Sequence, residues 1–379
     1  MHYPDGGESP EEPERRRLRR ARERLREGAG DALVLFPSPN LEYLSGFRES
    51  PGERHLLLFV PSDGEPLFFV PELYRDQVER DSRVGDVRTW GDDEEPLSRL
   101  ERIARELGLA DGHLLIDDTM WARFTQDLRT ACPDATFGLA SEVLARLRSR
   151  KDAAEIDALD RAGDVFDAAM ADVRDLGERA IGMTETELGG WIGERLAEHG
   201  GTGTSFETIV GSGPNGAMPH HTHGDREIRP GDPVVLDFGT RVDGYPSDGT
   251  RTVVFAGEPD REFREVHGIV REAQNAAVEA VEPGETVGTV DAAAREVIEE
   301  AGYGDRFIHR TGHGIGLDVH EEPYVVADGD RVLETGMAFS VEPGIYLPDS
   351  FGVRIEDVVV VTEGGARRLT HADRGWRVG

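Results

Sequence analysis

The first 140 residues alternate between short apolar runs and stretches with apolar residues at helical spacing. Short runs rich in valine, leucine and isoleucine predict buried strands, whereas apolar residues every three or four positions predict helices with one buried face. This alternation predicts a small α/β domain. The predicted strands are 32–36, 55–60, 67–70 and 113–116, and the predicted helices are 11–28, 72–80, 96–107 and 119–130.

Beyond this region the pattern changes to longer helices separated by hairpin signals. One helical pattern runs from 141 to 176. Asp243-Gly244 lies between two apolar runs, and because glycine accepts a positive φ, the pair predicts a tight turn. Further helices are predicted at 184–199, 260–280 and 286–301, and a second hairpin is predicted from strands 337–346 and 352–362.

These patterns predict an α+β protein with two domains. A chain of 379 residues is long for one hydrophobic core, which also favours two domains. We expect a disordered leader over residues 1–12, an N-terminal domain over 13–145 and a C-terminal domain over 146–379.

Composition narrows the classes of function. The net charge of −32 disfavours nucleic-acid binding, and an acidic surface whose only lysine is Lys151 indicates adaptation to high salt. No apolar stretch approaches the ~18 residues of a membrane span. Cys132 is the only cysteine, so no disulfide framework is expected, and a reducing cytoplasm is the expected location.

The candidate chemistry lies in the C-terminal part, where four carboxylates interrupt apolar segments. They are Asp237, Asp248, Glu342 and Glu356, and His313 lies between glycines nearby in the sequence. Burying unpaired carboxylates costs several kcal/mol each, so such a cluster needs compensating positive charge. Four oxygen donors and one nitrogen donor are enough to bind two divalent cations, and they suit Mn²⁺, with Co²⁺, Fe²⁺ and Zn²⁺ as alternatives.

Hairpin geometry brings these carboxylates together. If Asp243-Gly244 forms the turn, Asp237 faces Thr250 and Asp248 is its diagonal neighbour; a turn at 242–243 would oppose the two aspartates directly. Either register leaves the side chains about 5–8 Å apart, which suits two ions about 3.5–4 Å apart. The same alternation sets the two glutamates on a common face, opposite the aspartates.

Further polar residues surround the predicted centre. His220, His309 and His320 are candidates for binding a carbonyl oxygen or transferring protons, although His221 and His223 cannot be separated from His220 by sequence. Arg354 lies two residues before Glu356, where it can orient a carboxylate or bind substrate. We expect Asp243, Glu321 and Glu322 to be solvated, and Asp357 to point away from the site in a structural role.

Several segments closely resemble the proline-specific peptidases of the pita-bread fold, which include prolidase and aminopeptidase P. The resemblance is strong over 145–379 and looser over the first 140 residues, which are similar to the creatinase-type N-terminal domain. The segments are Asp237-Phe-Gly, Gly244-Tyr-Pro-Ser-Asp-Gly-Thr-Arg-Thr, Thr311-Gly-His-Gly-Ile-Gly, Ser340-Val-Glu-Pro-Gly and Val353-Arg-Ile-Glu-Asp.

The resemblance implies hydrolysis of the peptide bond before proline by a homodimer. It makes the four carboxylates and His313 the metal ligands, and it chooses His220 over His221 because an x-Thr pair follows the family's catalytic histidine. It assigns His220 to stabilising the substrate and the tetrahedral intermediate, His309 and His320 to the substrate pocket, and Arg354 to the groups that surround the metal ligands. We therefore expect His220, His320 and Glu342 to be catalytic, with Glu342 also accepting a proton. A prolidase-type dipeptidase is favoured over an aminopeptidase P, and a non-catalytic peptide-binding module is a further alternative.

Overall fold

The computed structural model describes residues 12–378, and the chain divides into two compact units, Met1–Arg148 and Ser149–Gly379. The expected leader at 1–12 lies outside the described residues, except for Glu12. We keep 13–145 and 146–379 as the proposed domain limits. The expected α+β architecture with two domains is confirmed.

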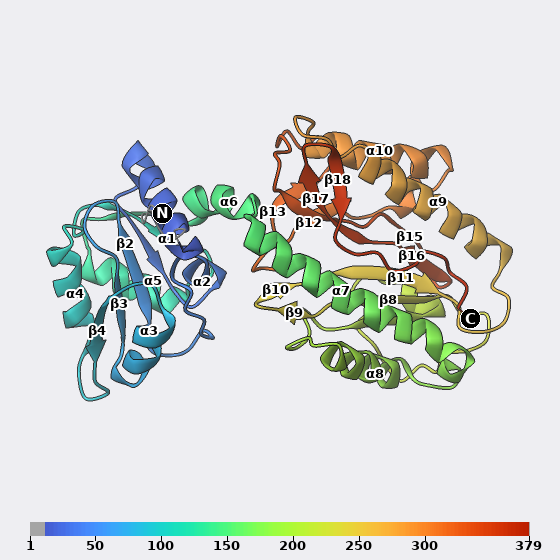
Figure 1. Ribbon diagram of the computed structural model, residues 1–379, viewed down its shortest axis with the longest axis horizontal. Coiled ribbons are helices and arrows are strands. Elements are labelled where there is room, and N and C mark those ends of the chain that lie inside the picture. The colour runs from blue at the N-terminus through green and yellow to red at the C-terminus, as the bar shows by residue number, and fades with distance from the viewer. Residues whose placement is uncertain (1–11, 379) are drawn as a thin grey trace, which may run out of the picture. The chain divides into compact units, whose positions relative to one another are not determined.

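The N-terminal unit is built on a six-stranded mixed sheet with the order β4-β3-β2-β1-β5-β6 (Figure 1). Its helices α4 and α5 pack on a core that includes Phe59, Phe69 and Phe124. The strands are β1 (Ala32–Leu35), β2 (Leu57–Pro61), β3 (Leu67–Pro71), β4 (Asp86–Trp90), β5 (His113–Ile116) and β6 (Thr136–Leu139), and the helices are α1 (Pro13–Arg24), α2 (Pro39–Ser45), α3 (Arg75–Asp81), α4 (Pro96–Glu106) and α5 (Ala122–Ala131).

One prediction about local structure was incomplete. The single helix expected at 141–176 is two helices, α6 (Ser141–Ser149) and α7 (Ala153–Leu176). The break has a local cause, because the Asp152 side chain accepts a hydrogen bond from Glu155 N and the Glu155 side chain bonds back to Asp152 N. This capping box starts a new helix at residue 153.

The C-terminal unit pairs each of its two main sheets with helices (Figure 1). Helices α7 and α8 share a core with the three-stranded sheet β11-β8-β7, and α9 and α10 share one with the five-stranded sheet β13-β12-β14-β17-β18. The helices are α8 (Glu185–Glu198), α9 (Arg261–Glu279) and α10 (Val287–Glu300), and the strands are β7 (Ile209–Ser212), β8 (Val234–Phe238), β11 (Gly249–Val253), β12 (Gly312–Gly314), β13 (Glu321–Val325), β14 (Ala338–Val341), β17 (Asp357–Thr362) and β18 (Gly365–Arg368).

The first hairpin adopts one of the two registers considered from the sequence. Asp243 and Gly244 have φ of 50° and 87°, as a two-residue turn between β9 (Arg241–Val242) and β10 (Tyr245–Pro246) requires. Further along the hairpin, Thr250 pairs with Asp237. Asp248 is therefore the diagonal neighbour of Asp237, and both carboxylates reach the same side of the sheet.

The second hairpin is interrupted where its two glutamates lie. Strands β14 and β17 end their ladder at the pair Val341–Asp357, and β15 (Gly344–Leu347) with β16 (Phe351–Arg354) begins another at Gly344–Arg354. Both ladders share one register, which sets Glu342 opposite Glu356. Since neither glutamate belongs to a ladder, both side chains lie in a gap between paired segments.

Candidate metal centre

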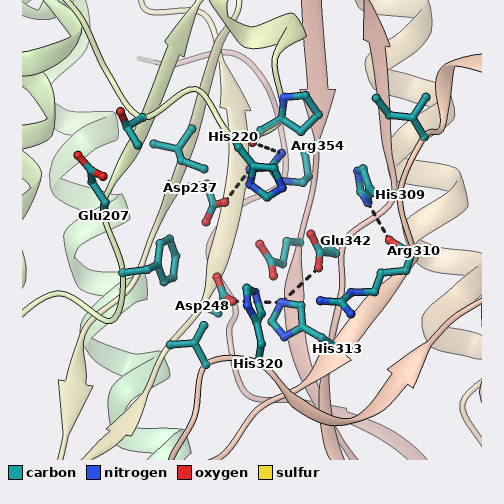
Figure 2. Close-up of a pocket in the computed structure, with 17 residues that line it drawn as sticks. Glu207, His220, Asp237, Asp248, His309, Arg310, His313, His320, Glu342 and Arg354 are labelled. Carbon is teal, nitrogen blue, oxygen red and sulfur yellow. Dashed lines mark hydrogen bonds and ion pairs between the residues drawn. The ribbon is translucent and has the colours of Figure 1, made fainter. Parts of the chain in front are cut away.

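A cavity of about 610 Å³ in the C-terminal unit gathers all nine residues predicted from the sequence. They come from β8, from the segment before β11, from the loop after β7, from the segments around β12 and from both sides of the second hairpin (Figure 2). Its lining includes Asp237, Asp248, Glu342, Glu356, His220, His309, His313, His320 and Arg354, together with Glu207 and Arg310.

Three of these residues form a compact cluster of donor atoms. One ligand atom each from Asp248, His313 and Glu356 lies within 4.8 Å of the others. Nε2 of His313 is 3.6 Å from Oδ2 of Asp248 and 3.3 Å from Oε1 of Glu342. The Nδ1 of His313 is 3.2 Å from the Gly314 carbonyl oxygen, which can only accept, so Nδ1 carries the proton and Nε2 faces the carboxylates.

Asp237 lies in the same hairpin as Asp248 and lines the same cavity. Its Oδ2 accepts a hydrogen bond of 2.6 Å from Nη2 of Arg354. Its Oδ1 is buried and has no hydrogen-bond partner among residues 12–378. A buried acceptor without a partner is costly, and a cation removes that cost. Thr250 supports the arrangement, because its hydroxyl donates to Oε2 of Glu356 at 2.7 Å and accepts from Nε of Arg354 at 3.1 Å.

The electrostatics show that Arg354 compensates the acidic charge of this cluster only in part. Burial raises the pKa of Glu342 to about 7. Burial, reinforced by the neighbouring carboxylates, raises the pKa values of Asp248 and Glu356 well above their usual range. Burial and the neighbouring His320 lower the pKa of His313 to about 3, so its imidazole is neutral. Oxygen-rich donors, one neutral imidazole and uncompensated negative charge fit divalent cations.

The structure shows which of the three neighbouring histidines, His220, His221 and His223, faces the cavity. His220 lines the cavity. The Nε2 of His221 instead lies 2.8 Å from Oε2 of Glu185, and the Nδ1 of His223 lies 3.1 Å from the Thr186 hydroxyl. In a loop, the direction of a side chain does not follow a repeating pattern along the sequence. The three-dimensional structure is therefore needed to distinguish the three histidines.

His309 and Arg354 are joined through Tyr346, a residue that the sequence analysis did not select. Nδ1 of His309 donates to the Arg310 carbonyl oxygen at 2.7 Å, so Nε2 accepts from the Tyr346 hydroxyl at 2.9 Å. The Tyr346 oxygen accepts in turn from Nη1 of Arg354 at 2.8 Å. Both ring nitrogens of His309 are thus engaged. His320 packs edge-on against His313, with ring centres 4.0 Å apart.

The expectation that Glu321 is solvated was wrong. Its carboxylate is mostly buried and lies 2.6 Å from Nζ of Lys151, whose side chain is fully buried. The partner lies 170 residues earlier in the chain, so no local pattern could reveal it. The structural role expected for Asp357 is confirmed, because its buried carboxylate accepts from Arg251 at 2.6 Å and from Arg368 at 3.0 Å.

None of the helices within residues 12–378 is both long and apolar enough to cross a lipid bilayer.

Comparison with known proteins identifies the family to which both parts of the chain belong. Residues 17–150 match the creatinase/prolidase N-terminal domain, and residues 157–363 match metallopeptidase family M24. The chain is 44% identical over 341 residues to a probable dipeptidase PepE of Mycobacterium tuberculosis, covering 88% of each chain. It is 39% identical over 361 residues to an Xaa-Pro dipeptidase of Lactobacillus helveticus, covering 93% of this chain and 96% of the relative.

A solved structure extends the agreement to the whole fold. The crystal structure of a prolidase from Thermococcus sibiricus matches with a TM-score of 0.91 and 39% identity, over 97% of this chain and 100% of that one. The expected pita-bread fold is thereby confirmed. The chain belongs to metallopeptidase family M24 and is a metal-dependent hydrolase with a creatinase-type N-terminal domain.

Proposed function

We propose that this protein is an Xaa-Pro dipeptidase that hydrolyses the peptide bond before proline with two bound divalent cations. One observation carries the proposal: four buried carboxylates and one neutral imidazole converge in a cavity whose two arginines, Arg310 and Arg354, leave an excess of acidic groups. The relatives named Xaa-Pro dipeptidase and prolidase support the choice of bond.

In this proposal Asp237, Asp248, His313, Glu342 and Glu356 hold the cations, with Mn²⁺ as the proposed ion and Co²⁺, Fe²⁺ and Zn²⁺ as alternatives. Bound cations of this kind lower the pKa of water and polarise a carbonyl oxygen.

The remaining residues position the substrate and move charge. Glu342 accepts the proton released by the attacking water. His220 or His320 helps to hold the negative charge that develops on the substrate carbonyl oxygen. Arg354 keeps Asp237 in place, and His309 holds Tyr346 beside Arg354.

A second cation in the cavity supports a dipeptidase over an aminopeptidase P. Arg354 is committed to Asp237, whereas no ion pair within residues 12–378 joins Arg310 to a carboxylate. The Arg310 guanidinium lies 4.4 Å from the centre of the Tyr324 ring, and its side chain extends toward Glu342 and His313 (Figure 2). We propose that Arg310 binds the free carboxylate of a dipeptide, because guanidinium and carboxylate pair in a bidentate geometry.

Hydrolysis of Ala-Pro, Ala-Pro-amide and Ala-Pro-Ala, with metal analysis of the purified enzyme, tests both proposals. We expect bound divalent metal and at least ~10-fold faster turnover of Ala-Pro, a preference that Arg310→Gln removes. Arg306→Gln is the matched control, since Arg306 is exposed and does not line the cavity. Rapid cleavage of Ala-Pro-Ala would instead identify an aminopeptidase, and protein without metal or activity would favour the peptide-binding module.

Three further properties are proposed from the sequence. The single, buried Cys132 supports a cytoplasmic location, and the resemblance supports a homodimer. The net charge of −32 supports a salt-adapted surface. Thermal melts in dilute and molar KCl test the last of these, and higher stability in dilute buffer would contradict it.

A further inference from the structure

Glu185, at the start of α8, is fully buried but lies outside the residues that line the cavity. Its Oε1 accepts hydrogen bonds from the backbone N–H and the hydroxyl of Ser212, both at 2.7 Å, and from Asn215 Nδ2 at 3.0 Å. Its Oε2 accepts from His221 Nε2 at 2.8 Å and from Gly224 N at 3.0 Å. One carboxylate therefore binds donors on both sides of a single loop.

These hydrogen bonds keep the carboxylate ionised. Burial alone would raise the pKa of Glu185, but hydrogen bonds from Ser212, His221 and Asn215 outweigh burial and lower the pKa overall. Each of these contacts is therefore charge-assisted, and such hydrogen bonds are about twice as strong as neutral ones. An amide at this position would replace one accepting oxygen with an N–H₂ group, which donates. That group would then face N–H or O–H groups that donate to the carboxylate in the wild type.

The loop that these contacts hold, residues 218–224, has no regular secondary structure and carries His220. On one side of His220, the Pro219 carbonyl oxygen accepts from Nη1 of Arg354 at 3.4 Å. On the other side, Glu185 holds His221 and Gly224. His220 thus lies between two fixed points of the loop: one is held by Arg354, which lines the cavity, and the other by Glu185, which does not.

We propose that Glu185 is a positioning residue whose carboxylate fixes the 218–224 loop and thereby sets the place of the His220 imidazole in the cavity. The inference rests on the proposed role of His220 on the substrate carbonyl oxygen. A displacement of about 1 Å in a catalytic group can cost about 10²-fold in rate. The amide variant therefore lowers kcat and leaves KM and metal content nearly unchanged.

A double-mutant cycle with Ala-Pro and Mn²⁺ separates positioning from general stability. We expect Glu185→Gln to lower kcat about 10- to 100-fold in the wild-type background and less than about 2-fold in His220→Ala. Equal losses in both backgrounds would overturn the proposal. Asp117→Asn is the matched control, because Asp117 is a buried carboxylate in the N-terminal unit that accepts from Ser38 at 2.6 Å and from Thr119 at 2.8 Å.

Two measurements keep the test decisive. If Glu185→Gln does not fold, His221→Gln removes one donor from the same carboxylate, and the same cycle with His220→Ala applies. Crystal structures of wild type and variant require no activity: a displaced His220 with unmoved metal ligands supports the proposal, and an unmoved His220 overturns it. Failure of the wild-type enzyme to cleave Ala-Pro would contradict the proposed function alone.

Discussion

Glu356 and Asp357 are neighbours in the sequence and both are buried, but the protein surrounds their charges differently. The Asp357 carboxylate faces Arg251, which is itself buried, and also accepts from Arg368. Burial raises the pKa of Asp357, but Arg251 and Arg368 outweigh it, so that pKa is lowered overall. Burial and the carboxylates of the cavity raise the pKa of Glu356.

The comparison shows two ways to bury a carboxylate on adjacent positions of one segment. On the Asp357 face, the chain supplies its own cations, and the arrangement is complete. On the Glu356 face, Arg354 is the cation in hydrogen-bond contact with the acidic cluster, through Asp237. The protein therefore leaves the second face dependent on ions from solution, and metal removal should affect the two faces differently.

Glu356→Gln should produce the largest effect. Removing this ligand should lower Ala-Pro hydrolysis by about 10³-fold or more, because bound cations supply most of the activation of water and carbonyl. In metal-free protein the same change removes an uncompensated charge, so the free energy of unfolding should stay equal or increase. Activity assays and urea unfolding in EDTA check both results, and a variant that retains activity would contradict the assignment of Glu356.

Asp357→Asn should have the converse effect. It leaves the buried Arg251 guanidinium without its carboxylate, which should lower the free energy of unfolding by about 3 kcal/mol. The loss should be the same with EDTA and with Mn²⁺, since this ion pair does not involve the cavity. Urea unfolding under both conditions measures it, and a loss seen only with metal would show that the two faces are not independent.

A smaller effect concerns pH in the metal-free protein. The pKa of Glu342 is raised from 4.5 to about 7, so the folded state binds this proton more tightly than the unfolded chain. The resulting stability is present below the unfolded pKa and is lost as pH rises toward 7. The free energy of unfolding should fall by about 2 kcal/mol between about pH 5 and about pH 8. Chemical unfolding at several pH values measures the slope.

Two controls sharpen this pH prediction. Glu342→Gln should reduce the slope in EDTA and leave the part that Asp248 and Glu356 contribute through their own raised pKa values. Saturating Mn²⁺ should remove the slope in the wild type because the bound cations displace the protons. A slope that persists unchanged in both would have to come from another group.

Much of this site could be predicted from the sequence because its geometry follows from local rules. Asp243-Gly244 predicts a tight turn because both residues accept a positive φ, as the structure shows. A turn at 243–244 or one residue earlier left two possible registers for Asp237 and Asp248. Strand alternation then assigned each carboxylate to a face. Helix limits such as those of α10 were also predictable, because a clear apolar periodicity and the Thr286 cap mark them.

What the sequence did not reveal depends on contacts between distant segments. Glu321 and Lys151 are 170 residues apart, and Arg251 and Asp357 are 106 apart. Strand β4 also escaped prediction, because three of its five residues are polar and only Trp90 is buried, as is typical of an edge strand. The contacts of His220, His221 and His223 could not be assigned without the position of Glu185, which binds His221.

The pairing of Lys151 with Glu321 has a practical consequence. The chain contains no other lysine, and this one is fully buried in the folded state. Acylating reagents that attack side-chain amines should therefore leave the native protein untouched there and react only when this part of the chain opens. The rate of acylation at Lys151 thus measures how often this part of the C-terminal unit unfolds locally.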